Sequence, residues 1–137
     1  MNLKKLGIAS GAAFVAYSAL AYVIHNVLLV GDYQAIATSL RTPEEFLQRL
    51  PLIYIGNLVL AVALTVIYAH GYEPSKNWIG QGFRFGLIVG TLMAPPVALT
   101  EYVVYPLPGA LALKWIGLGY LQMVITAWVV AGIYRTD

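Results

Sequence analysis

Apolar residues fill four long segments of this chain, and polar residues gather in the connections between them. The segments cover about residues 6–29, 51–70, 83–105 and 111–134. Each reaches the length of about 20 mostly apolar residues that a helix needs to cross the hydrocarbon core of a bilayer. The short alternating segments typical of a membrane β-barrel are not found, and a helix is the other way for a backbone to satisfy its hydrogen bonds in lipid. The pattern predicts an all-α integral membrane protein with four spans.

Composition indicates the same class of protein. Hydrophobic residues make up 60% of the 137 residues, and charged residues make up 10%, against about 25% in ordinary soluble domains. A chain of this length forms one domain, 1–137, and a soluble fold of this size could not bury so much apolar surface. Lys4 and Lys5 precede the first apolar segment, as in a signal peptide, but this segment is longer than a typical signal core. We therefore expect it to remain as a span.

Several kinds of chemistry are excluded by what the chain contains. The net charge of +2 is too small to indicate nucleic-acid binding, and without cysteine there are no disulfides and no cysteine metal sites. His25 and His70 are expected at opposite faces of the membrane, so they cannot share a metal or a haem. No serine, histidine and acid arrangement and no phosphate-binding glycine loop stands out. We expect no enzyme: no catalytic residue, no metal and no cofactor.

Lysine and arginine are distributed unequally over the connections. With the N-terminus inside, five of these residues lie on the inner side and three on the outer side. This asymmetry predicts that both termini are cytoplasmic, because basic residues favour the cytoplasmic side. The inner set is Lys4, Lys5, Lys76, Arg84 and Arg135, and the outer set is Arg41, Arg49 and Lys114.

The longest outer connection, residues 31–50, contains a helix-start signal. Thr42 and Glu45 have the spacing of a capping box, with Pro43 at the first helical position. Phe46 and Leu47 then begin a short apolar face. We expect a short interfacial helix that lies on the outer surface and leads into the second span.

Small residues recur along the third span at every fourth position, as Gly82, Gly86, Gly90 and Ala94. Such a stripe lets a neighbouring helix approach closely. In the first span, Gly7 and Gly11 begin a comparable face that continues towards Ser18 and His25. With small or polar stripes on all four spans, we expect a four-helix bundle.

The two halves of the chain also share a weak similarity. Ile55-Gly56 in the second span aligns with Ile116-Gly117 in the fourth, and Tyr22-Val23 in the first corresponds to Tyr102-Val103 in the third. Two interpretations stay open. The halves are two-helix repeats related by an axis along the membrane normal, or the matches are chance similarity between apolar helices.

Polar residues within the spans are the candidate functional residues, because ionisable groups are costly inside a membrane. Glu101 lies on the face of the glycine stripe, near the outer end. The other polar residues at a similar depth are His25, Asn57, Tyr102 and Lys114. Together they form a possible polar cluster, which either binds a ligand or a proton, or is structural: a mutually satisfied network, or a Glu101 at the outer end that reaches Lys114 and water. We favour the second alternative because the position is close to the surface.

Pro95 and Pro96 lie in the middle of the third span. A proline removes a backbone donor and clashes with the preceding turn, so a kink is expected. Broken helices mark some transport sites. For this pair we favour a purely structural kink.

Three segments carry a resemblance to known proteins. They are 22–29 with the following Asp32-Tyr33, 82–87, and 102–109. They resemble small four-span bacterial membrane proteins grouped as a domain of unknown function. The resemblance implies a location in the bacterial cytoplasmic (inner) membrane and brings no activity, cofactor or site residue with it.

The function expected from these features is non-enzymatic. We expect an accessory or structural subunit in the lipid bilayer, which packs against another membrane protein or against itself as a homo-oligomer. The alternative is a small oligomeric transporter or channel that uses the outer polar cluster around Glu101. A cavity lined by Glu101, His25 and Asn57 would favour the transporter, and a lipid-exposed glycine stripe would favour the subunit.

Overall fold

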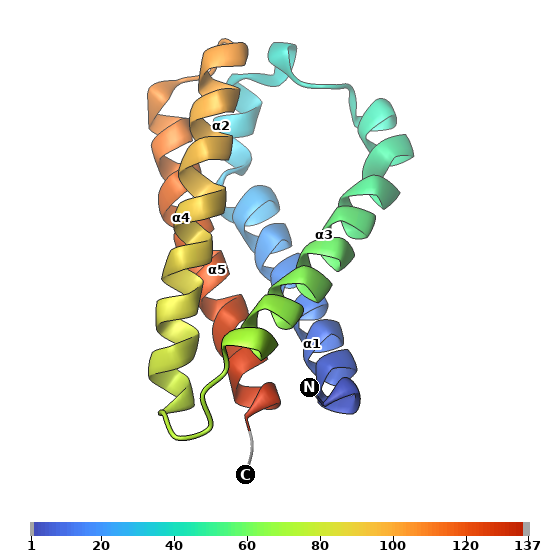
Figure 1. The fold of residues 1–137 in the computed structure, drawn as a ribbon. Coiled ribbons are helices and arrows are strands. Elements are labelled where there is room, and N and C mark those ends of the chain that lie inside the picture. The colour runs from blue at the N-terminus through green and yellow to red at the C-terminus, as the bar shows by residue number, and fades with distance from the viewer. Residues whose placement is uncertain (1, 136–137) are drawn as a thin grey trace.

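The computed structural model describes residues 2–135, and this part of the chain is almost entirely helical. Helix α1 (Leu3–Val23) continues through a π-helical turn, η1 (Ile24–Leu28). A short helix, α2 (Val30–Ala35), and a 3-10 turn, η2 (Ala37–Ser39), follow in the first long connection. The remaining helices are α3 (Pro43–Gly71), α4 (Trp78–Val104) and α5 (Gly109–Tyr134) (Figure 1). Counting η1 with α1, four helices within residues 2–135 are long and apolar enough to cross a membrane, as the sequence predicts.

The capping box at the start of α3 is formed as predicted. The side chain of Thr42 accepts a hydrogen bond from the backbone of Glu45, and Pro43 occupies the first helical position. The prediction of a separate interfacial helix is wrong, however, because α3 continues through Pro51 as one helix of 29 residues. Pro51 is exposed, so the carbonyl that it leaves without a partner can be hydrated. The short helical elements of this connection are instead α2 and η2.

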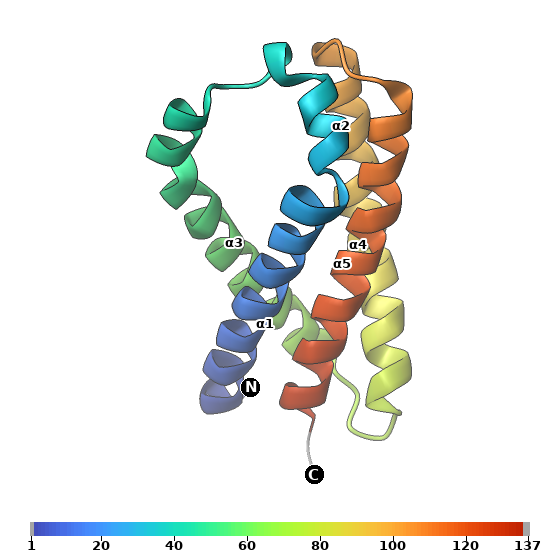
Figure 2. The same cartoon turned by 180° about the vertical axis from the view of Figure 1, so that it is seen from behind.

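The helices form two pairs of different geometry. Helices α4 and α5 run side by side, whereas α1 and α3 cross each other (Figures 1 and 2). Helix α1 packs on both α3 and α5, but α3 makes no extensive contact with α4. The end that holds both termini is termed the termini end. The opposite end, with residues 29–42 and 105–108, is termed the linker end, and there α3 diverges from the other helices (Figure 1).

The predicted small-residue stripe of α4 lies against α5 of the same chain. A Cβ atom added at Gly86 would lie 2.6 Å from the Cα atom of Val124, which is closer than real Cβ atoms approach. A glycine is therefore required there for the two backbones to meet. The stripe runs from Gly82 through Gly86 and Gly90 to Ala94, and on α5 it meets Ala131, Val124, Tyr120 and Gly119.

The small face predicted for α1 is wrong in its first half. A Cβ atom added at Gly7 or Gly11 would meet nothing within 4 Å. The buried residues of α1 are Ala9, Ser10 and Ala13 instead, on the adjacent face. Alanine and serine are nearly as small as glycine, and here they are the residues that let α3 and α5 approach.

The two interpretations of the internal similarity are not resolved by the helix pairing. Consecutive long helices do pack together, α1 with α3 and α4 with α5. The pairs nevertheless differ, since one crosses and the other runs side by side (Figure 2).

Helix α4 continues as one helix through Pro95 and Pro96.

Candidate functional site

A cavity of about 670 Å³, termed the deep cavity, lies where α3 has diverged from the other helices. Three helices, α1, α4 and α5, supply nearly all of its wall, and α3 contributes only Ile53 among the described residues. Most of the wall is apolar, and its polar residues are Tyr17 on α1, His25 on η1, Glu101 on α4 and Gln122 on α5. The apolar lining includes Ile24, Ile53, Met93, Val97, Leu118 and Met123.

A second cavity of about 490 Å³, termed the mouth, lies towards the linker end. It shares two lining residues, Glu101 and Trp115, with the deep cavity, so these two residues lie where the cavities meet. The mouth is more polar than the deep cavity. Its other lining residues are Ser39, Leu40, Arg41, Glu45, Tyr105 and Leu107.

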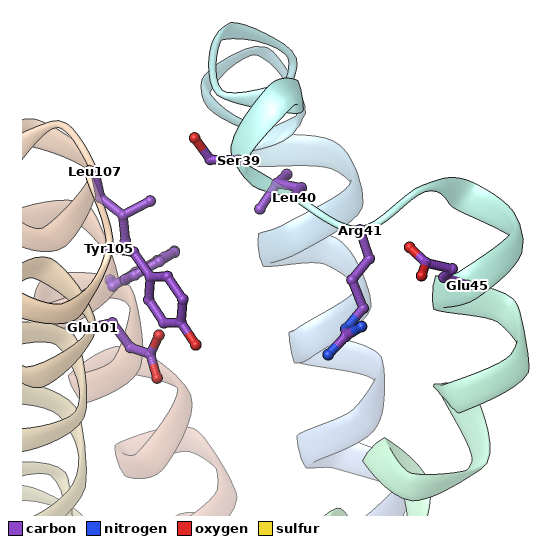
Figure 3. A pocket seen from close by; sticks show the side chains of 8 residues that line it. Ser39, Leu40, Arg41, Glu45, Glu101, Tyr105 and Leu107 are labelled. Atoms are coloured by element: carbon purple, nitrogen blue, oxygen red, sulfur yellow. The ribbon is translucent and has the colours of Figure 1, made fainter.

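Charged side chains face one another across the mouth. Glu101 and Tyr105 lie on the α4 side, and Arg41 and Glu45 lie on the side of the connection and α3 (Figure 3). The Glu101 carboxylate and the Arg41 guanidinium both extend into the space between the two sides (Figure 3). Within residues 2–135, neither group makes a hydrogen bond or an ion pair with another side chain. Both are therefore free to interact with a molecule that enters the mouth.

A chain of hydrogen bonds holds α2 against α5 beside the mouth. The Tyr33 hydroxyl accepts a hydrogen bond from Nε1 of Trp115 at 2.9 Å and lies 2.5 Å from Nδ1 of His25. Because an indole nitrogen can only donate, the Tyr33 proton remains free to be donated to a neutral His25. The rings of Tyr33 and His25 are also stacked, with centroids 5.9 Å apart. This network fixes the position of the Trp115 ring, which borders both cavities.

The π-helical turn η1 places His25 in this network. Its backbone is wider than an α-helix, and the amide of Leu29 bonds the carbonyl of Ile24 at 2.9 Å. Leu29 and Ile24 are both buried in a cluster with Leu111 on α5. Apolar anchoring and the extra residue in the turn together aim His25 at Tyr33.

The polar residues that the sequence singles out do not all come together. Glu101 and His25 line the same deep cavity, but Asn57 lies elsewhere, where it donates a hydrogen bond to Ser18 at 3.1 Å. Lys114 forms an ion pair with Asp32 at 2.8 Å and not with Glu101, so the expected contact between Glu101 and Lys114 is wrong. Tyr102 is exposed, and its ring lies beside Gly109. The single predicted cluster is thus divided among four places.

Sequence patterns give little signal for Arg41, Tyr33 and Trp115. Arg41 stands out in the sequence only by its charge, and α2, which positions Tyr33, has no helix-start signal of its own. Trp115 has the position of an interfacial aromatic residue, which hides its hydrogen bond.

The described residues offer little for covalent or metal chemistry. Within the range 2–135, no three His, Cys, Asp or Glu side chains are placed to hold a metal ion. What the site offers is an apolar hollow, a polar mouth and two opposite charges. Comparisons with family models, with curated proteins and with solved structures found no match to this chain.

Proposed function

We propose that this protein binds an amphiphilic lipid within a membrane and catalyses no reaction. The observation that carries the proposal is the gradient along the two joined cavities, from an apolar hollow to a charged mouth. An amphiphile has the complementary gradient from its tail to its headgroup. The two cavity volumes also fall in the range of about 300–1,000 Å³ that is typical of small-molecule sites.

The four long helices support the membrane setting. They contain 26 to 29 residues each, which at 1.5 Å per residue gives a length of about 40 Å, enough to cross a bilayer. The termini end has the larger set of basic residues, so we place it, with both termini, in the cytoplasm of a bacterial cell. The mouth then lies in the outer leaflet of the cytoplasmic membrane, at the depth of lipid headgroups.

The route of the lipid is lateral. Residues 51–56 of α3 are exposed at every position, although a helix packed on one face buries every third or fourth residue. The ring of Tyr54 touches that of Phe14 on α1, but this part of α3 is otherwise thinly covered, which leaves the gap to α4 open to the hydrocarbon of the bilayer. A lipid tail can enter the deep cavity there while its headgroup stays in the mouth.

An accessory subunit is the second candidate. The exposed outer part of α3 favours it, because a helix of a partner protein or of a second copy could fill the same gap. The glycine stripe no longer supports this candidate, since it packs against α5 and is not exposed to lipid. The lipid proposal also explains the charged mouth, which a partner helix would have to bury.

The test fills the deep cavity and leaves the fold intact. Val97 lines the cavity and is 54% exposed, so Val97→Trp adds bulk into open space. Val103→Trp, at a position that is 82% exposed on the same helix and lines neither cavity, is the matched control. The proteins are extracted in a mild detergent, and native mass spectrometry counts the lipids that stay bound.

We expect a retained lipid in the parent and in Val103→Trp, and its loss in Val97→Trp. Equal lipid retention in all three proteins would contradict a lipid in this cavity. A stoichiometric partner protein or a dimer that is lost in Val97→Trp, with no retained lipid in the parent, would establish the accessory subunit instead.

A further inference from the structure

The mouth has one unpaired charge of each sign on opposite sides. Glu101 is partly buried at the end of α4, and Arg41 is exposed in the extended segment that precedes α3. Their charged groups extend into the same space (Figure 3). A partly buried carboxylate without a partner loses hydration that nothing in the protein replaces. A bound ligand with the opposite charge would restore that interaction.

The neighbouring charges are already engaged. The carboxylate of Glu45, which also lines the mouth, accepts hydrogen bonds from Thr42 in the capping box. Nearby at the linker end, Lys114 is paired with Asp32. Glu45 keeps its negative charge, but these hydrogen bonds fix its carboxylate, so Glu101 and Arg41 are the charged groups in the mouth that have no side-chain partner within residues 2–135.

We propose that the mouth selects a zwitterionic phospholipid headgroup, with its phosphate on Arg41 and its ammonium on Glu101. Guanidinium and phosphate are a well-matched pair, because the planar donors of arginine fit two phosphate oxygens. The ammonium group lies on the other side of the headgroup, towards Glu101 and the hydroxyl of Tyr105. This inference rests on the proposed function and names its ligand class.

A singly charged headgroup satisfies only half of the mouth. An anionic headgroup such as phosphatidylglycerol leaves Glu101 unpaired and near a like charge. A cationic alkylamine leaves Arg41 in the same situation. The zwitterion is the class that pairs both groups. The charges alone therefore predict that it binds the mouth more tightly than the other two classes when the tails are equal.

The experiment removes one charge at a time and measures whether the preferred lipid class changes. The full chain in detergent is titrated with three lipids of equal tail length, namely a phosphatidylethanolamine, a phosphatidylglycerol and a long-chain alkylamine. Native mass spectrometry reports the relative occupancy. The parent should prefer phosphatidylethanolamine by about ten-fold, the size of one charge-assisted hydrogen bond.

The variants should change the preferred class. Glu101→Gln leaves Arg41 alone and should shift the preference to phosphatidylglycerol, while Arg41→Gln leaves Glu101 alone and should shift it to the alkylamine. Glu44→Gln and Arg49→Gln are the matched controls, because both residues are exposed near the same end and line neither cavity. These two variants should keep the order of the parent.

The outcomes separate the two proposals. If the parent retains lipid but shows no headgroup preference, or if Glu101→Gln and Arg41→Gln keep the parental order, the headgroup inference is wrong and lipid binding stands. If no lipid binds at all, the proposed function fails first. Soluble phosphoethanolamine, which lacks a tail, should not compete at the concentration of the lipid; effective competition would overturn a lipid as the source of the headgroup.

Discussion

The two halves of this molecule differ in how closely their helices pack. In the α4–α5 hairpin, glycines let the two backbones touch, and residues 105–108 form a short connection that keeps the helix ends together. In the α1–α3 half, the glycines at 7, 11 and 56 face open space, and residues 29–42 separate the helices by a long connection. Close packing and a short loop produce a rigid platform. Without them, α3 crosses α1 and leaves a cavity.

The strongest test of this comparison places a bulky residue in each half. Gly86→Leu forces a side chain into the backbone of Val124, and we expect it to lower the free energy of unfolding by about 3 kcal/mol. Gly11→Leu, where the added Cβ meets nothing within 4 Å, should change it by less than about 0.5 kcal/mol. Thermal unfolding in detergent measures both. Similar losses in the two variants would show that the halves are equally packed.

A second, smaller effect concerns the attachment of α2 to the platform. Tyr33→Phe removes the hydroxyl that joins His25 and Trp115, and it leaves the indole N–H without an acceptor. We expect a loss of about 1–3 kcal/mol at pH 7. Tyr22→Phe, at an exposed position of α1, is the control and should unfold like the parent. If Tyr33→Phe leaves the free energy of unfolding unchanged, α2 is held by apolar contacts alone.

The same hydroxyl gives a pH dependence of known sign. Burial raises the pKa of Tyr33 above its ordinary value of 10.0, although the hydrogen bond from Trp115 lowers it, and the charge of Asp32 raises it again. The folded state then holds this proton more tightly than the unfolded state, so the contribution is complete below pH 10 and is lost as the pH rises above it. Tyr33→Phe should remove this part of the alkaline loss of stability.

The smallest expected effect is that of the ion pair between Lys114 and Asp32. Their side chains are 50% and 24% exposed, so solvent screens the pair, and its coupling energy should be at most about 1 kcal/mol. A double-mutant cycle with Lys114→Gln and Asp32→Asn measures this energy, and added salt should reduce it. A cycle between Lys114 and Glu101 should give no coupling. Coupling there would restore the pairing that the sequence suggested.

Sequence patterns predict one half of the molecule better than the other for a physical reason. The glycine stripe of α4 is periodic, so spacing alone places Gly86 and Gly90 on the packed face. Spacing fails for Gly7 and Gly11, because a small residue permits close contact without requiring it. The long helices are recognisable from the length of their apolar segments. The capping box correctly marks where α3 begins, but it does not show where that helix ends, so the short interfacial helix was expected in error.

The candidate site was predictable only in part. Glu101 and His25 stand out because they are polar within apolar segments. Their surroundings depend on how residues 29–42 fold back, and that segment has neither strong periodicity nor a clear cap before Thr42. Lys114 pairs with Asp32 and not with Glu101, and Trp115 bonds Tyr33; the residues of both contacts are about 80 positions apart in the sequence. His25 contacts Tyr33 across a turn. Local patterns cannot rank such competing partners.

The position of the tight hairpin in the chain has a consequence for the order of assembly. Ribosomes make α1 and α3 first, yet α1 also packs on α5, which is synthesised later. Until α5 is made, the buried face of α1 at Ala9 and Ala13 has only α3 to cover it. The first two long helices therefore exist for a time as an incomplete pair, and the 26-residue helix α5 completes the packing of the described helices.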